Sequence, residues 1–182
     1  MQISLVMTVI GRDRPGLVDS VASVVAEQGG NWLESRMSRL GGHFAGIVRV
    51  QVPAESEPAV VRALQALAAQ GLTVVVHSDQ AGVAQELKLL RVLEIVGQDR
   101  PGIVRQISHA LASFGVNVEE LHTEVSSAAM SGETLFKARA TVSIPPVCNL
   151  AELRAKLEQI AEDLIVDVSF GEVPAGGTAA AA

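Results

Sequence analysis

The sequence has little of what disulfide-bonded and metal-binding proteins need. It contains a single cysteine, Cys148, so no disulfide can form within the chain. Its four histidines are never three to five residues apart, and no pair of cysteines accompanies them, so the spacing typical of a zinc site is missing. We therefore expect no disulfide, no metal and no other cofactor, and a reducing, cytoplasmic compartment fits this use of cysteine.

Positive charge and long apolar runs are scarce as well. The chain has 14 Lys and Arg against 20 Asp and Glu, and both halves are acidic, with 6 basic against 8 acidic residues in 1–86 and 8 against 12 in 87–182. Such a chain does not attract phosphate backbones, so we expect no direct binding to nucleic acid. No apolar run approaches the roughly 18 residues of a membrane span, and residues 1–10 lack the basic start of a signal peptide. We expect a soluble protein without a membrane partner.

The familiar enzyme motifs are missing too. The glycines of residues 11–16 are followed by Leu-Val rather than by the Lys-Ser/Thr of a phosphate-binding loop, and no Gly-x-Ser-x-Gly elbow or dinucleotide fingerprint occurs. Cys148 stands alone in one copy, which favours a structural role over a nucleophile. Glu34 and Glu120 are weak catalytic candidates, because they lie on expected strand faces with Trp32 and Arg36 or with Val118 and His122, where a solvated or ion-paired carboxylate is expected. The sequence favours binding or regulation over catalysis.

What the chain does contain is a repeat with an offset of 86 residues. Residues 11–18 read Gly-Arg-Asp-Arg-Pro-Gly-Leu-Val and return as Gly-Gln-Asp-Arg-Pro-Gly-Ile-Val at 97–104, with six of eight positions identical. The same offset pairs Ala26 with Ala112, Gly29 with Gly115, Asn31 with Asn117 and Glu34 with Glu120. With 182 residues and 48% hydrophobic content, the chain can bury two small cores. The second copy has about six extra residues, assigned to 126–132.

Within each copy the hydrophobic period changes in a fixed order. Alternation predicts a strand over 2–10, and the helical spacing of apolar residues from Leu17 to Val25, Val18 and Val24 included, predicts a helix with its apolar face on the sheet. Prolines, glycine pairs and further periodic runs predict the other elements. The expected strands are 31–39, 43–52, 72–77, 117–126, 134–144 and 164–170, and the expected second helices contain Val60, Val61, Leu64 and Leu67 in one copy and Leu150, Leu153, Leu157 and Ile160 in the other.

This order is βαββαβ, twice, so the predicted fold class is α+β with two tandem ferredoxin-like domains, each an antiparallel sheet with helices on one face. We expect domains at 1–82 and 87–173, a linker at 83–86 and a disordered tail at 174–182. One sheet face of each copy lacks helical cover, so the two copies, or two chains, should pack their sheets edge to edge or face to face, and we expect a homo-oligomer.

The Asp-Arg-Pro-Gly turn allows two interpretations. The proline can simply begin a helix, and the aspartate can cap it. Alternatively, the glycine lets a small carboxylate approach free backbone N–H groups, while the aspartate suits an ammonium group and the arginine suits a carboxylate. The asparagine at the start of each second strand either forms a turn or recognises the carboxylate. The candidate ligand contacts are Asp13, Arg14, Gly16, Leu17 and Asn31 in the first copy and Asp99, Arg100, Gly102, Ile103 and Asn117 in the second.

A strand, this turn and a helix ending in Gly-x-Asn resemble the ACT-domain family of small-molecule sensors. Two copies without a catalytic unit, together with the sequence from Asn117 to Phe136, are similar to the glycine cleavage system transcriptional repressor family. The resemblance implies a bacterial cytoplasmic regulator that responds to glycine and acts through a DNA-binding transcription regulator. It also implies an effector site where two domains meet, against Gly16 with Asn31 and Gly102 with Asn117. Ala129 stands where that family often has proline, which counts against assigning this loop to a partner contact.

Two functions follow from these observations. The leading hypothesis is a non-enzymatic, amino-acid-responsive regulator of transcription that works by protein contact. The alternative is a freestanding regulatory subunit of an amino-acid or one-carbon enzyme, because similar domains accompany enzymes such as formyltetrahydrofolate deformylase. Co-purification with a DNA-binding regulator or with a metabolic enzyme distinguishes them.

Overall fold

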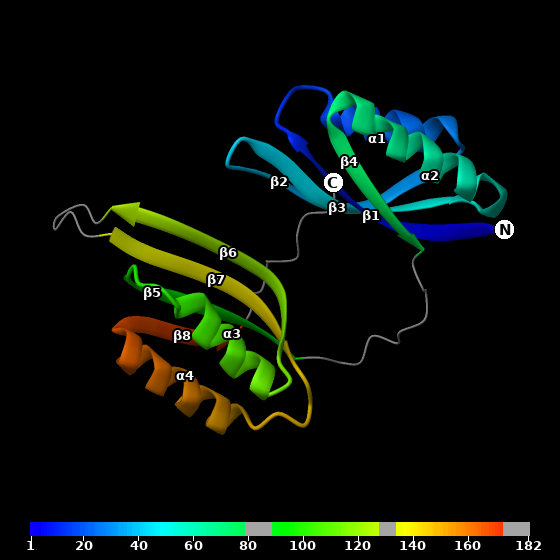
Figure 1. The fold of residues 1–182 in the computed structure, drawn as a ribbon. Coiled ribbons are helices and arrows are strands. Elements are labelled where there is room, and N and C mark those ends of the chain that lie inside the picture. Colours follow the sequence, from blue (N-terminus) through cyan, green and yellow to red (C-terminus); the bar gives the residue numbers. More distant parts are fainter. Residues whose placement is uncertain (79–88, 128–133, 173–182) are drawn as a thin grey trace. The chain divides into compact units, whose positions relative to one another are not determined.

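The computed structural model describes residues 1–78, 89–127 and 134–172 (Figure 1). The chain divides into two compact units, Met1–Ala84 and Gln85–Ala182. The expected linker and tail lie outside the described residues, as does most of the expected insertion, so these three expectations remain predictions.

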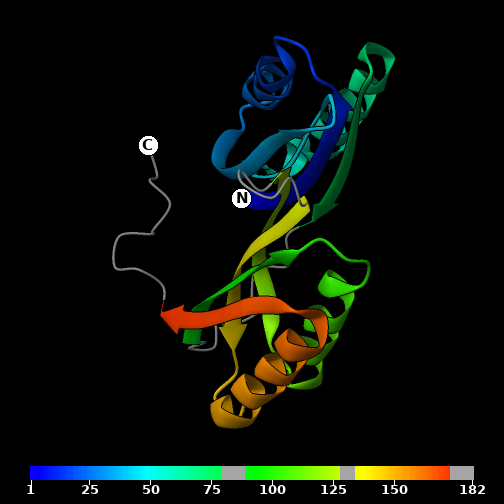
Figure 2. The same ribbon diagram turned by 90° about the vertical axis from the view of Figure 1, so that its left-hand side faces the viewer.

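Each unit is a four-stranded antiparallel sheet with two helices against one face (Figures 1 and 2). Strand order is β2-β3-β1-β4 in the first unit and β6-β7-β5-β8 in the second. The predicted α+β, ferredoxin-like βαββαβ arrangement is confirmed for both units. The first unit consists of β1 Gln2–Arg12, α1 Leu17–Glu27, β2 Asn31–Leu40, β3 His43–Pro53, α2 Glu57–Ala66 and β4 Leu72–Ser78, with short 3-10 turns at Ala54–Ser56 and Leu67–Gln70. The second consists of β5 Leu89–Gln98, α3 Ile103–Ser113, β6 Asn117–Ser127, β7 Thr134–Ile144, α4 Leu150–Leu164 and β8 Val166–Glu172.

The alternation of apolar and other residues along β1 gives the strand one buried and one more exposed face, as predicted. Leu5, Met7 and Val9 are buried beneath the helices, while their neighbours along the strand face the other side of the sheet. Each unit has its own core, one made of residues between 5 and 74 and the other of residues between 93 and 166. The loop between the first strand and the first helix of each unit is therefore held in place by the core of that same unit.

Two expectations about the helices need correction. Val18 is 44% exposed, as is its counterpart Val104, because the helix rests on the sheet along a narrow stripe and the second helical residue points away from it. The last strand begins at Val166 rather than at 164, because Leu164 ends α4 and Ile165 takes a left-handed backbone conformation after it. None of the helices in the described part of the chain is both long and apolar enough to span a bilayer.

Candidate functional site

The loop between β1 and α1 borders a hollow of about 330 Å³. Four of the five candidate contacts of the first copy lie around it, so the structure brings these sequence-predicted residues together. The hollow is lined by Asp13, Arg14, Gly16, Leu17, Val18, Asp19 and Phe44.

The second glycine of each turn has a positive φ, which explains why it is glycine. Gly16 has φ 90° and Gly102 has φ 100°, and each directly precedes its helix. The first helical hydrogen bonds run from the N–H groups of Ser20 and Gln106 back to these glycines, both at 2.9 Å. The three N–H groups before them have no partner within the helix. Backbone donors at the start of each first helix are therefore available to a ligand.

This geometry overturns two structural interpretations of the turn. The helices begin at Leu17 and Ile103, two residues after the prolines, so Pro15 and Pro101 do not start them. At neither helix start does a side chain within the described residues accept a capping hydrogen bond, so the aspartates are not caps.

The charged side chains of the first loop have partners in their own unit. Asp13 forms an ion pair with Arg39 on β2, with 2.6 Å between carboxylate oxygen and Nε, and its backbone N–H donates to the carbonyl oxygen of Gly42 at 3.0 Å. Arg14 donates from Nη2 to the carbonyl oxygen of Gln70 at 3.1 Å. A ligand at this loop would have to compete with these contacts.

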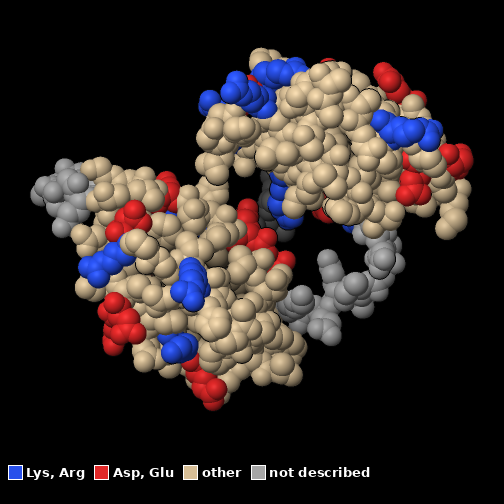
Figure 3. All heavy atoms as spheres, viewed as in Figure 1, with Lys and Arg blue, Asp and Glu red and all other residues tan. Residues whose placement is uncertain are grey.

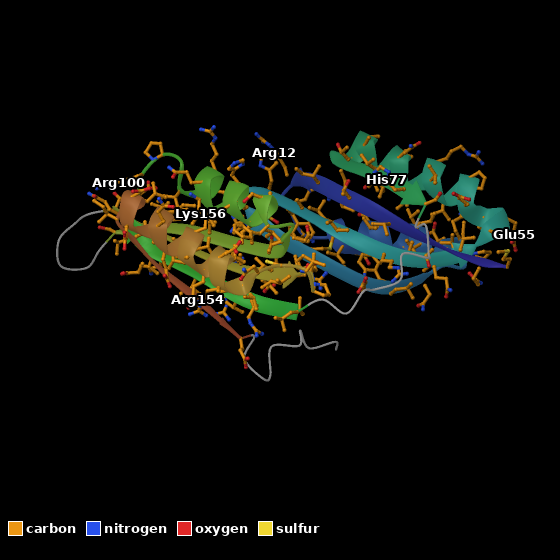
Figure 4. The ribbon with its side chains drawn as sticks, turned by 90° about the horizontal axis from the view of Figure 1, so that it is seen from below. Arg12, Glu55, His77, Arg100, Arg154 and Lys156 are labelled. Atoms are coloured by element: carbon orange, nitrogen blue, oxygen red, sulfur yellow. The ribbon has the colours of Figure 1, made fainter. Side chains whose placement is uncertain are left out.

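The second loop has the same backbone path and different side-chain contacts. The backbone N–H of Asp99 donates to the carbonyl oxygen of Thr134 at 2.9 Å, as that of Asp13 does to Gly42. Arg100 donates from Nη2 to the side-chain oxygen of Gln98 at 3.0 Å and extends from the rim of the second unit (Figure 4). On the face seen in Figure 3, basic and acidic side chains are interspersed over this unit.

The two asparagines do not lie beside the loops of their own units. Asn31 is opposite Gln51, which is opposite Ser4 near the start of β1, whereas Gly16 follows the end of that strand. Because a strand rises about 3.3 Å per residue, the eight residues from Ser4 to Arg12 span about 26 Å along β1, so the asparagine and the loop lie toward opposite ends of the sheet. The same register holds in the second unit. A small ligand that contacts both kinds of residue must therefore be held by two copies of the fold.

Asn117 is also engaged locally. Its side-chain N–H donates to Glu119 at 2.9 Å, and the buried hydroxyl of Ser143 donates to the same carboxylate. Asn31, an exposed residue, makes no side-chain hydrogen bond to the described residues. The repeated asparagines are thus equivalent in place but not in their contacts.

Glu34 and Cys148 each have local contacts within their own unit. Glu34 lies 3.9 Å from Arg49 in an exposed ion pair. Cys148 is partly buried against the core, and burial raises the pKa of its thiol, with the charge of Glu152 adding to the rise. Within residues 1–78, 89–127 and 134–172, no three acidic, histidine or cysteine side chains form a group that could hold a metal ion.

Two features of the sites escaped sequence reasoning. Asp19 borders the first hollow. A search for positions that are identical in the two copies does not find it, because the equivalent residue of the second copy is Arg105. A second hollow of about 440 Å³ lies on the uncovered sheet face of the second unit, among charged strand residues that include Glu94, Glu120 and Arg139. Nothing in a single strand reveals it, because three neighbouring strands contribute.

Comparison with known proteins covers both units. Residues 4–77 and residues 91–168 each match a family model described as ACT domain. The chain is 29% identical over 79 residues to a UPF0237 protein from Streptococcus mutans, covering 43% of this chain and 83% of that protein. It is 31% identical to an unknown protein from Galdieria sulphuraria whose crystal structure superposes with a TM-score of 0.83, covering 95% of this chain and 99% of the other. A crystal structure provisionally assigned as a glycine cleavage system transcriptional repressor is 20% identical, with a TM-score of 0.67 over 94% of this chain and 97% of that one.

Proposed function

Because the chain belongs to the ACT-domain family, with one domain in each half, we propose that it is a non-enzymatic regulator that responds to a small amino acid, with glycine as the first candidate. The observation that carries the proposal is the strand–helix loop of each unit. Each loop carries one aspartate carboxylate and one arginine guanidinium. The glycine that directly precedes the helix has no side chain, and the first backbone N–H groups of the helix have no partner within it. An α-amino acid carries the matching ammonium and carboxylate groups.

The proposed contacts are the loop residues of one copy of the fold and the asparagine of another. The register supports this arrangement, because each asparagine and its own loop lie toward opposite ends of a strand segment that spans about 26 Å. A ligand held in this way stabilises one pairing of domains and so changes the surface that the protein presents. Sensing would thus be coupled to assembly.

We further propose that the output is transcription, through contact with a DNA-binding regulator rather than with DNA. The acidic halves of the chain support indirect action. The glycine signal and the transcriptional target come from the sequence resemblance, and the structure provisionally assigned to such a repressor has the same fold along nearly its full length. A homo-oligomer is part of the proposal, since Ile10, Ile47 and Val75 are half exposed on the uncovered sheet face of the first unit.

Thermal unfolding of the purified full chain against each amino acid at about 10 mM tests the sensor. A ligand at about a hundred times its dissociation constant adds about 2.7 kcal/mol to the free energy of unfolding, and this raises Tm by roughly 5 to 10 °C. We expect the largest rise with glycine. If no amino acid changes Tm, the sensor proposal is wrong.

Capture from a bacterial lysate, with and without glycine, tests the output. We expect a DNA-binding regulator to be retained by the wild-type chain and lost when Gly16 and Gly102 are both replaced by tryptophan, with circular dichroism as the check on folding. Recovery of a metabolic enzyme whose rate changes on binding would favour the alternative of a regulatory subunit. Unchanged target-gene expression in a deletion strain would contradict a role in transcription.

A further inference from the structure

The two sheets differ on their uncovered faces, which lie opposite the helices. Side chains directly opposite each other on neighbouring strands point to the same side of a sheet, so the register assigns residues to each uncovered face. Equivalent rows across the first and second sheets consist of Arg36, Ile47, Thr8 and Val75 and of His122, Arg139, Glu94 and Ser169. The same fold therefore presents different chemistry on its two uncovered faces.

The uncovered face of the first unit combines exposed apolar residues with positive charge. Ile10, Ile47 and Val75 on this face are between 47% and 55% exposed. Besides two histidines, the register assigns to it three arginines and one glutamate, namely Arg12, Arg36, Arg49 and Glu34. Glu34 lies 3.9 Å from Arg49. The side chains of the other two arginines are exposed, and neither makes an ion pair or a hydrogen bond with the described residues.

The uncovered face of the second unit is acidic and hollowed. Besides one histidine, the register assigns to it four carboxylates and two cations, namely Glu94, Glu120, Glu124, Asp167, Lys137 and Arg139. Two of the carboxylates form ion pairs with the cations, at 2.6 and 3.2 Å. The side chains of Glu120 and Asp167 are exposed, and neither makes an ion pair or a hydrogen bond with the described residues. The hollow of about 440 Å³ lies on this face, with Glu120 and the apolar Val96 in its lining.

These charges favour contact between unlike faces. Two copies of the first face would bring like charges together, and so would two copies of the second. The first face against the second instead places the two arginines opposite the two carboxylates that lack an ion pair in the described part of the chain. The same contact covers the exposed apolar residues of the first face, and the hollow gives room to side chains that project from the opposing sheet.

We infer that the uncovered face of the first unit in one chain docks on the uncovered face of the second unit in another chain. The inference rests on the proposed function, because it names the surfaces that form the homo-oligomer proposed there. Each chain carries both faces, so two chains can make the contact twice in a closed dimer, the commonest form of soluble oligomer. Arg12 and Arg36 on one face, and Glu120 and Asp167 on the other, select the pairing.

Sedimentation velocity of the full chain over a concentration series tests this pairing. A first-face variant carries Arg12→Glu and Arg36→Glu, and a second-face variant carries Glu120→Arg and Asp167→Arg. Each variant alone opposes like charges in the contact, so we expect its dissociation constant to rise at least about tenfold. An equimolar mixture of the two variants should associate again, because opposite charges then meet in both contacts of the mixed dimer.

The matched controls reverse exposed charges on the helices, on the covered side of each sheet. Arg62→Glu with Arg105→Glu changes the net charge as the first-face variant does, and Glu158→Arg with Glu162→Arg changes it as the second-face variant does. Both controls should associate like the wild-type chain. All the substituted side chains are exposed and make no hydrogen bond or ion pair with the described residues, so every variant should keep the wild-type Tm.

The possible failures are distinguishable. Association that survives in either variant would mean that like faces or strand edges make the contact, and this would overturn the inference while leaving a homo-oligomer intact. A mixture that stays dissociated would overturn it as well. If the wild-type chain sediments as a monomer at every concentration, the proposed homo-oligomer fails and the inference fails with it, whereas the thermal panel tests the sensor separately.

Discussion

The first glycine of the repeated turn motif lies where two strands approach closely. A Cβ on Gly97 would lie 2.6 to 2.8 Å from atoms of Val166, and one on Gly11 would lie 2.7 Å from the carbonyl oxygen of Gly71. Side chains do not occupy such distances without movement of the neighbouring strand. This glycine repeats because of packing, whereas the second glycine of the motif repeats because of its positive φ.

We therefore predict that Gly97→Ala lowers the free energy of unfolding by about 1 to 3 kcal/mol, because the added methyl group overpacks the contact with β8. Urea unfolding followed by circular dichroism measures it. Gly171→Ala is the matched control, since a Cβ there has nothing within 4 Å, and it should change stability by less than about 0.5 kcal/mol. Equal destabilisation by both variants would contradict the packing explanation.

The thiol of Cys148 should be alkylated slowly. Burial and the nearby charge of Glu152 raise the pKa of this thiol, so a smaller fraction is thiolate at pH 8 than in an exposed cysteine. We expect iodoacetamide to alkylate it more slowly than a cysteine-containing peptide at pH 8, with the rate rising as the pH increases further. Mass spectrometry follows the reaction, and Glu152→Gln should speed it. A rate at pH 8 equal to that of the peptide would show that the thiol is not perturbed.

Among the elements, α4 has a side-chain cap that α2 lacks. Asn149 accepts hydrogen bonds from the N–H groups of Ala151 and Glu152 at 3.1 and 3.3 Å, and its own amide donates to the Glu152 carboxylate at 2.7 Å. Ser56 precedes α2 without any such bond from its side chain. The last helix of the second unit is thus fixed at its start by three polar contacts.

The corresponding prediction is that Asn149→Ala lowers the free energy of unfolding by about 1 kcal/mol, the usual effect of losing an N-cap. Ser56→Ala should change it by less than about 0.5 kcal/mol, because no capping bond is lost. Urea unfolding of both variants compares them within one fold. Similar losses in the two would mean that the contacts of Asn149 contribute little.

The positions of the strands and helices along the chain were largely predictable, because the spacing of apolar residues differs between a strand and a helix. The strand over 2–10 and the helix from Leu17 follow from periods of two and about 3.6 residues. The exposure of Val18 was not predictable, because a helix's own sequence does not reveal how wide a stripe the sheet covers. The same limitation applies to the end of α4, where Leu164 is apolar and suits either the helix or the strand.

For the whole molecule, the separate cores predict that each unit folds alone. Among residues 1–78, 89–127 and 134–172, the buried cluster of the first unit contains no residue of the second, and the reverse also holds. We expect fragments 1–84 and 85–182 each to unfold cooperatively, with far-UV spectra that add to that of the full chain. Circular dichroism of the two fragments is the measurement. A fragment that stays unfolded alone would show that its stability depends on the other unit.

The sequence by itself determined the fold, because an 86-residue repeat with two hydrophobic periods leaves few arrangements that bury both apolar faces. It also located the first loop, since Asp-Arg-Pro-Gly occurs where strand spacing changes to helical spacing. Only the tertiary structure decided which loop charges are already paired. Arg39 lies 26 residues from Asp13 in the chain and reaches it because β2 lies on the same sheet, while Val125 occupies that place in the other unit. Such pairing depends on strand register, which brings together residues whose separation along the chain gives no sign of contact.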